Sequence, residues 1–127
     1  VPVMATRIGC AILPMPMPCA LPLDGESVLW KHGSSAFAGT DLDFRLKALG
    51  VTELVVAGAV AAFCVTSTVR MASDLGYTVL LPQDALLGFD LAAHEGGRID
   101  AATVQRVTLS ILGADFARLT TVDDLAA

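Results

Sequence analysis

Short apolar runs alternate with amphipathic segments over most of this chain, and this alternation constrains the fold more than any other feature. The runs are rich in β-branched residues, as buried strands are, and each is followed by apolar residues at helical spacing. From Ser27 onward the predicted order is β-α-β-α-β-α-β-α. Strands that alternate with helices form a parallel sheet covered on both faces, so we expect a doubly wound, Rossmann-like α/β fold.

Residues that start or stop helices set the expected boundaries. Thr40, Asp100 and Thr121 are candidate N-caps, and Gly50 and Gly76 are placed to end helices. The expected strands are 1–6, 27–30, 53–58, 77–82 and 118–120; the expected helices are 40–49, 64–75 and 100–112, followed by a terminal helical turn; residues 9–26 and 84–97 are expected to be connections.

Composition narrows the possible functions before any motif is considered. We expect the 127 residues to form a single domain, 1–127, which is long enough to bury a core. Hydrophobic residues make up 54% of the chain, which is high for a soluble monomer, so we expect a homo-oligomer, either a dimer or a larger assembly. The net charge of −5 and the lack of a basic stripe argue against a nucleic-acid partner.

Two apolar stretches resemble membrane segments only superficially. Pro14, Pro16, Pro18 and Pro22 interrupt the first 22 residues, and residues 54–69 are too few to span a bilayer, so we expect no membrane partner. The three cysteines, Cys10, Cys19 and Cys64, have no metal-binding or CxxC spacing, and their odd number favours a reducing, cytoplasmic location. No glycine-rich phosphate-binding motif occurs, and we expect no cofactor.

Cys64 is the candidate nucleophile. It follows a predicted strand by a short turn and would lie in the first turn of a helix, where the helix dipole stabilises a thiolate. Free backbone N–H groups of that turn could also stabilise an oxyanion. Lys31 ends a different strand, and its ammonium would stabilise negative charge nearby. Position alone allows a plainer interpretation, in which Cys64 is a small core residue and Lys31 is solvated.

The motifs around Cys64 favour the catalytic interpretation. Residues 28–86, VLWKHGSSAFAGTDLDFRLKALGVTELVVAGAVAAFCVTSTVRMASDLGYTVLLPQDAL, contain the ordered series K…SAF…TDL…G…CV, followed by a CVxxTxR pattern. This series resembles the isochorismatase-like cysteine hydrolase family, and the resemblance covers roughly residues 23–127. It implies an enzyme, commonly oligomeric, that cleaves amide-type C–N bonds through a cysteine thioester. One branch of the family hydrolyses a vinyl ether and does not need the cysteine.

The resemblance also assigns roles to particular residues. Cys64 matches the family's catalytic cysteine, and Lys31 matches its catalytic lysine. The backbone N–H groups of Val60 and Cys64 would form the oxyanion hole. A non-proline cis peptide bond usually precedes the first of these residues, which places it at Ala59–Val60. The metal-binding members carry an early Asp-x-His…His cluster, and no histidine precedes His32 here, so we expect no metal site.

Other side chains near the proposed site have weaker claims. Phe37, Phe63 and His32 are candidates for a substrate pocket, although core packing for the two phenylalanines and a loop position for His32 are the plainer interpretations. His94 is an alternative base for Cys64. Asp84 ends a predicted strand, and its equivalent in the family looks structural.

One catalytic group of the family has no match in this chain. The family's general acid/base is an aspartate at the end of its first strand, whereas the opening VPVMATRIG resembles its second strand. That first strand is central in the family's sheet, so we expect a gap between two half-sheets. Three explanations stay open: the sequence is a fragment of a longer protein, which Val1 in place of methionine favours; another chain supplies the strand; or the protein is an inactive relative with a rearranged sheet.

The sequence therefore predicts a hydrolase that acts on a small-molecule amide through a thioester on Cys64. Two alternatives remain at this point. The chain could be a catalytically inactive domain of the same fold that serves assembly or binding, or it could be a vinyl-ether hydrolase. The identity of the substrate does not follow from the sequence.

Overall fold

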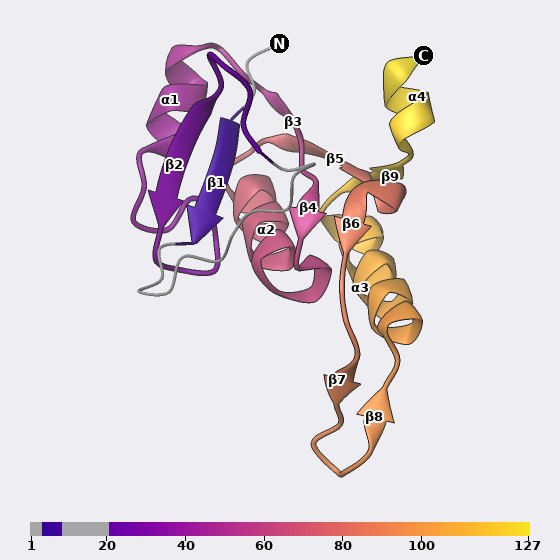
Figure 1. The fold of residues 1–127 in the computed structure, drawn as a ribbon. Helices are drawn as coiled ribbons and strands as arrows, with labels where there is room; N and C mark the ends of the chain where they lie inside the picture. The colour runs from indigo at the N-terminus through magenta and orange to yellow at the C-terminus, as the bar shows by residue number, and fades with distance from the viewer. Residues whose placement is uncertain (1–3, 9–20) are drawn as a thin grey trace.

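The computed structural model describes residues 4–8 and 21–127 (Figure 1). Cys10, Cys19, the first three residues of the expected first strand and most of the expected connection 9–26 lie outside this part. The described strands are β1 (Met4–Ile8), β2 (Ser27–Lys31), β3 (Glu53–Val55), β4 (Gly58–Ala59), β5 (Thr78–Pro82), β6 (Leu86–Leu87), β7 (Leu91–Ala92), β8 (Arg98–Ile99) and β9 (Arg118–Thr120). The described helices are α1 (Leu42–Ala48), α2 (Thr66–Asp74), α3 (Ala101–Asp115) and α4 (Val122–Ala126).

The parallel strands form separate groups instead of one continuous sheet. β1 pairs with β2, β3 and β9 flank β5, and β4 pairs with β6. Among the described strands, none pairs with both β1 and β3, so the expected gap between two half-sheets is confirmed. Val55 lies on the unpaired side of this division and is 56% exposed, although it belongs to an apolar strand.

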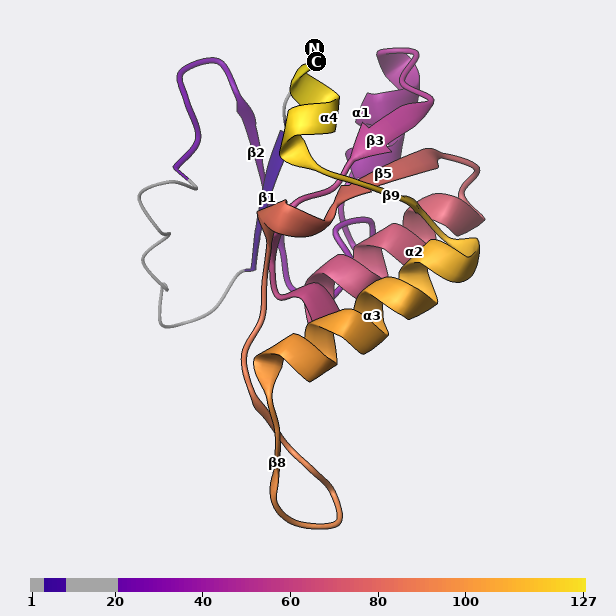
Figure 2. The same cartoon turned by 90° about the vertical axis from the view of Figure 1, so that its right-hand side faces the viewer.

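Helices cover both faces of the β3–β5–β9 sheet. Figure 2 shows α2 and α3 side by side on one face, with α1 and α4 toward the other. This arrangement confirms the doubly wound α/β class, because the connection through α1 returns on one face of the sheet and the connections through α2 and α3 return on the other. The hairpin β7–β8 is antiparallel and projects away from this body.

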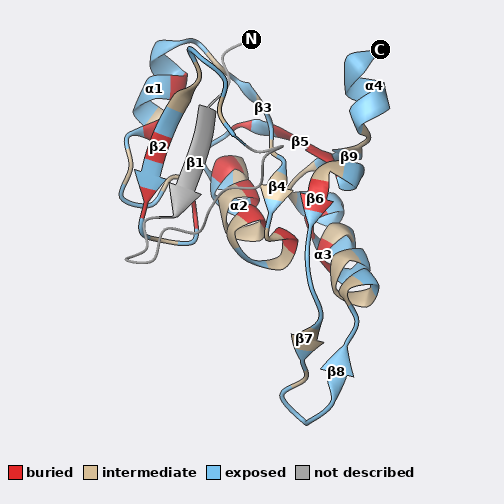
Figure 3. Ribbon diagram, in the orientation of Figure 1, coloured by how far each residue is buried: buried red, intermediate tan, exposed pale blue. Residues whose placement is uncertain are grey.

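The core lies where α2 and α3 meet β5. Leu81, Val69 and Leu112 are fully buried there, and Figure 3 shows further buried residues on α1 and β2. Apolar residues recur on one side of each helix, and burying that side provides most of the drive to pack it against the sheet. Tyr77 and Phe37 continue this core toward α1, with their ring centroids 5.9 Å apart.

Two expected caps are confirmed, and a third is wrong. The Asp100 side chain accepts a hydrogen bond from the Thr103 N–H at the start of α3, and Thr121 accepts one from Asp124 at the start of α4. Thr40 does not cap α1, because this helix begins at Leu42 and has Asp41 at the N-cap position. The Thr40 hydroxyl accepts instead from the Leu42 N–H and donates to a carbonyl four residues back.

Three further boundaries differ from the sequence-based expectation. The expected strand 53–58 is divided into β3 and β4, because the chain changes partner from β5 to β6 and bends at Gly58, whose φ is +113°. The helix expected from Cys64 begins earlier, with a π-helical turn over Ala61–Val65. The expected loop 84–97 contains β6, β7 and part of the β7–β8 hairpin.

Candidate active site

Cys64 lies within the turn that joins β4 to α2. The Ala59–Val60 peptide bond before this turn is cis, as the resemblance implied. Val60 is extended, with φ −99° and ψ 133°, and its carbonyl accepts hydrogen bonds from the N–H groups of Phe63 at 3.0 Å and Val65 at 3.3 Å. Single π-helical turns occur frequently at functional sites. The backbone around Cys64 is therefore a specific turn and not an ordinary helix start.

Small and buried residues allow the chain to take this turn. Ala61 is 1% exposed and Val65 is 4% exposed, so the inner side of the turn is anchored in the core while Cys64 is half-buried. The Thr66 backbone N–H donates to the Ala61 carbonyl five residues back and closes the wider π-helical ring, and the Thr66 hydroxyl donates to the same carbonyl at 2.7 Å.

Lys31 is the last residue of β2 and is only 4% exposed. Its Nζ donates hydrogen bonds to the carbonyls of Gly33 and Ser34, both at 2.8 Å. No ion pair of Lys31 is present within the part of the chain that the structure describes. Lysines are almost never buried in this way unless they are paired. The ammonium is thus held by carbonyl dipoles alone, and its charge is uncompensated by any described carboxylate.

Hydrogen bonds connect the Lys31 loop to the helix that follows Cys64. The Ser34 and Ser67 hydroxyls are 2.8 Å apart, and the Ala36 N–H donates to the Thr68 hydroxyl at 3.0 Å. Ser67 follows Cys64 by three residues, so this contact lies about one helical turn beyond the thiol. The structure therefore brings together the loop that binds Lys31 and the helix that carries Cys64, although the two residues come from separate sheets.

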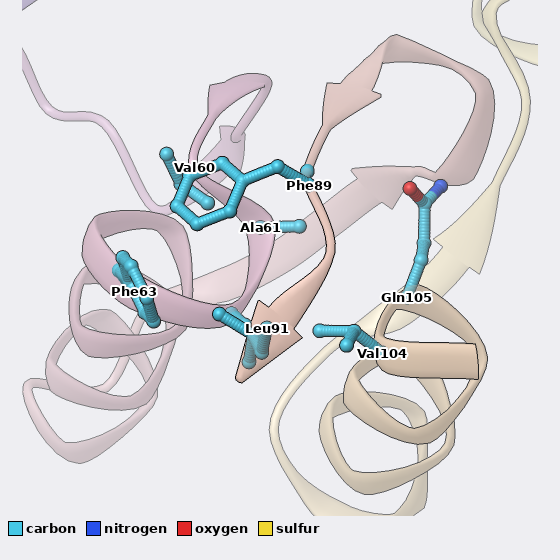
Figure 4. A pocket seen from close by; sticks show the side chains of 9 residues that line it. Val60, Ala61, Phe63, Phe89, Leu91, Val104 and Gln105 are labelled. Carbon is cyan, nitrogen blue, oxygen red and sulfur yellow. The ribbon is translucent and has the colours of Figure 1, made fainter. Parts of the chain in front are cut away.

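An apolar pocket adjoins the Cys64 turn on the side of the hairpin. Figure 4 shows side chains that converge on it from the turn, from the segment between β6 and β7, and from the start of α3. The Phe63 and Phe89 rings pack edge to face with their centroids 5.6 Å apart. The lining residues are Val60, Ala61, Ala62, Phe63, Gly88, Phe89, Leu91, Val104 and Gln105. This lining suits a small apolar group more than a charged one.

Of the three side chains expected to line a pocket, only Phe63 lines this one. Phe37 stacks on Tyr77 and packs against the core, and His32 is exposed in the loop after β2. Phe89 and Leu91 were missed, because they lie in a segment that the sequence predicts as a loop. The large apolar residues of that segment, Leu86, Leu87, Phe89 and Leu91, are the signal that could have indicated them.

The two other candidates occupy structural positions. The Asp84 carboxylate accepts hydrogen bonds from the Val122 N–H at 3.0 and 3.3 Å, and so holds the start of α4. His94 lies in the turn of the β7–β8 hairpin, with its side chain 91% exposed, at the end of the arm that projects from the body. Neither geometry provides a base for Cys64.

Residues 4–8 and 21–127 contain neither a metal-binding cluster nor a membrane-spanning helix. No group of three or more His, Cys, Asp or Glu side chains is arranged to bind a metal ion. None of the described helices has the length and apolar character needed to cross a bilayer.

Comparisons with known proteins agree with this geometry. The isochorismatase domain family matches residues 14–111. The chain is 35% identical over 104 residues to YrdC, an uncharacterized isochorismatase family protein of Bacillus subtilis, which covers 82% of this chain and 56% of YrdC. It is 40% identical over 65 residues to an N-carbamoylsarcosine amidase from an Arthrobacter species, which covers 51% of this chain and 25% of the amidase. The chain thus spans little more than half the length of YrdC and a quarter of the amidase.

Solved structures match over nearly the whole chain. An isochorismatase from Pseudomonas putida superposes with a TM-score of 0.90 at 30% identity, covering 97% of this chain and 68% of that protein. A cysteine hydrolase from Pseudomonas syringae has a TM-score of 0.81 at 29% identity, covering 86% of this chain and 51% of that protein. Because the family model matches residues 14–111 and YrdC is 35% identical over 82% of the chain, the chain belongs to the isochorismatase family.

Proposed function

We propose that this protein is a cysteine hydrolase that cleaves an amide-type C–N bond of a small molecule. The observation that carries the proposal is the contact between two segments: the loop that holds the buried Lys31 ammonium is hydrogen-bonded to the start of α2, directly after the π-helical turn that contains Cys64. The amidase and the cysteine hydrolase among the similar proteins support the same chemistry. The substrate would be a small molecule, and its identity stays open.

The reaction would proceed in two stages. The Cys64 thiolate would attack the amide carbonyl carbon, and the N–H groups of Val60 and Cys64 would stabilise the oxyanion. Collapse of this intermediate would break the C–N bond, and the amine would leave with a proton, so that a thioester remains on Cys64. Water would then hydrolyse the thioester to a carboxylic acid and restore the thiol. Lys31 would stabilise negative charge during both stages.

The proton for the leaving amine requires a further group. No described carboxylate pairs with Lys31, and the division between β1 and β3 lies between the two strands that lead to the site residues. We propose that an aspartate on a strand filling this division acts as the general acid/base. That strand would come from the rest of a longer protein or from another chain.

Selective alkylation provides the first test of the nucleophile. Iodoacetamide at pH 7 should modify Cys64 faster than Cys10 and Cys19, with each site followed by peptide mass spectrometry. Lys31→Met should slow the reaction at Cys64, because the ammonium no longer stabilises the thiolate. Labelling of Cys64 at or below the rate of the other two cysteines would contradict an activated thiol.

Turnover provides the second test. A panel of small amides, including N-carbamoyl amino acids, would be tested with the wild type, Cys64→Ala and Lys31→Ala. The proposal predicts that Cys64→Ala abolishes ammonia or amine release, whereas the exposed Ser110→Ala retains it. Turnover that survives Cys64→Ala would exclude the thioester route.

The divided sheet favours a second candidate function. A domain of this family without the central strand could serve assembly or binding without catalysis, and the absence of a described carboxylate beside Lys31 agrees with that. Slow alkylation of Cys64 together with no turnover of any amide would support it. Turnover of a vinyl ether that Cys64→Ala does not reduce would instead identify the cysteine-independent branch.

We also propose that the protein is a cytoplasmic homo-oligomer. Its 54% hydrophobic content and exposed apolar side chains on α3 and β6, such as Val107, Ile111 and Leu87, support association. Light scattering after gel filtration would give the mass in solution, and a mass of one chain at every concentration would contradict the oligomer.

A further inference from the structure

We propose that Ser67 and Thr68 are positioning residues, which act through the loop after β2 to fix the Lys31 ammonium relative to Cys64. The proposal rests on the function proposed above, and it assigns a role to α2, the helix that follows the Cys64 turn. Two hydrogen bonds form the contact, which we call the α2 clamp: Ser34–Ser67 and Ala36–Thr68.

The lysine side of the clamp is built from backbone carbonyls. Both described hydrogen bonds of the Lys31 ammonium go to the loop, at Gly33 and Ser34, and each is 2.8 Å long. The position of the ammonium therefore follows the position of these two carbonyls. Ser34 contributes twice, because its carbonyl binds Lys31 and its hydroxyl contacts Ser67.

The helix side of the clamp lies directly after the Cys64 turn. Ser67 and Thr68 follow the thiol by three and four residues, in the first turn of α2, which continues from the π-helical turn that contains Cys64. Val69, the next residue, is fully buried, and so this part of α2 is fixed against the core. A group held by Ser67 and Thr68 is thus held at a set distance from Cys64.

The divided sheet makes such a contact necessary. Lys31 ends a strand of the β1–β2 sheet, whereas Cys64 follows β4, which pairs only with β6. No backbone ladder among the described strands fixes one sheet against the other. Side-chain contacts must therefore set the distance between the ammonium and the thiol, and the α2 clamp is the contact closest in sequence to both.

The loop is rigid enough to transmit this restraint. Ser35 is 7% exposed and Ala36 is 3% exposed, so this part of the loop is packed against the core, whereas Ser34 is exposed. The Ala36 carbonyl accepts from Thr40 at 2.6 Å, and the Ser35 hydroxyl accepts from the Phe37 N–H at 3.2 Å. The Ala36 N–H has Thr68 as its acceptor, and loss of that acceptor would leave a buried donor without a partner.

The test measures how the alkylation rate of Cys64 depends on pH. Iodoacetamide rate constants at Cys64 would be measured between pH 5.5 and 10 by peptide mass spectrometry, using the full chain. Lys31→Met serves as the reference for complete loss of the ammonium. Ser67→Ala removes one clamp contact, Thr68→Val removes the other at nearly constant shape, and Thr68→Ser keeps the hydroxyl. Ser73→Ala, on the same helix, is the matched control.

The expected result is a graded shift of the pH–rate profile. Lys31→Met should move the midpoint of this profile to higher pH. Thr68→Val should move it in the same direction, and its rate at pH 7 should be at least about threefold below that of the wild type, which corresponds to a shift of about half a pH unit. Thr68→Ser and Ser73→Ala should match the wild type. Adding Thr68→Val to Lys31→Met should have no further effect, because the clamp acts only through the ammonium.

Two outcomes overturn the proposal in distinguishable ways. A profile of Lys31→Met that equals the wild type would overturn the proposed role of Lys31, and the clamp with it. A shift in Lys31→Met without one in either Thr68→Val or Ser67→Ala would overturn the clamp alone. Ser67→Ala keeps the result decisive if Thr68→Val does not fold, because Ser67 is only half-buried and its loss leaves the Ala36 N–H paired.

Discussion

The Tyr77 hydroxyl donates a hydrogen bond to Oδ1 of Asp43 at 2.7 Å, and this contact joins the start of β5 to α1. α1 follows a strand of one sheet and β5 belongs to the other, so the bond spans the division in the fold. Tyr77 is 7% exposed and its ring stacks on Phe37. The Asp43 carboxylate also forms an ion pair with the Lys47 ammonium, at 2.7 Å. This hydrogen bond and the α2 clamp thus join the two half-sheets through side chains, in addition to the apolar core that both half-sheets share.

Tyr77→Phe tests the contribution of this bond to stability. The ring would keep its stacking on Phe37, and only the hydroxyl and its hydrogen bond would be lost. We expect the free energy of unfolding to fall by about 1 kcal/mol, measured by urea denaturation at pH 7. Asp41→Asn is the control, because its ion pair with Arg45 is exposed and should contribute little. Equal effects of the two substitutions would contradict a bridging role for Tyr77.

The same tyrosine predicts a loss of stability at alkaline pH. Burial, together with the hydrogen bond to Asp43, raises the pKa of Tyr77 from 10.0 to about 12. Between these values the unfolded chain loses the phenolic proton before the folded chain does, so the free energy of unfolding falls as pH rises. Stability relative to Tyr77→Phe should be constant up to about pH 9 and should decline from pH 10 to 12. A constant difference between the two proteins through pH 11 would exclude the coupling.

Adjacent residues of α3 give a matched test of the core. Leu112 is 0% exposed, whereas Ile111, the residue before it, is 50% exposed. Leu112→Ala should lower the free energy of unfolding by about 2–5 kcal/mol, because it leaves a cavity against β5 and α2. Ile111→Ala should change it by less than about 1 kcal/mol. Urea denaturation of both variants checks the prediction, and similar losses would mean that α3 is packed differently from the structure described.

Local signals in the sequence predicted much of the fold. The alternation of apolar runs with helical spacing gave the α/β class, and Asp100 and Thr121 were identified as caps because their chemistry acts within four residues. The cis bond at Ala59–Val60 and the gap in the sheet followed from the family resemblance and not from local chemistry. The apolar runs predicted that Lys31 ends a strand and that Cys64 follows one, and the family resemblance assigned their catalytic roles.

Features that depend on distant partners could not be predicted in this way. The Ser34–Ser67 contact joins residues 33 apart, and no periodicity in the sequence encodes it. The β7–β8 hairpin pairs Leu91 with Ile99 across a segment that ends in Gly96 and Gly97, and its strands are only two residues long, so they resemble a loop. The π-helical turn requires the Val60 carbonyl to accept from two N–H groups, which is a matter of backbone geometry that residue types do not specify.

Replacement of the buried Lys31 should affect the reactivity of Cys64 without lowering the stability of the fold. The Lys31 ammonium is removed from water, and two carbonyls compensate for its charge without any described carboxylate. A methionine of similar length would fill the same space without a charge. We expect Lys31→Met to leave the free energy of unfolding within about 1 kcal/mol of the wild type, or to raise it, while the alkylation of Cys64 slows. Thermal and urea unfolding of the two proteins at pH 7 would measure the difference, with Lys47→Met as an exposed control. A loss of more than about 2 kcal/mol would show that Lys31 is retained for the structure of its loop and not for the charge it presents to the thiol.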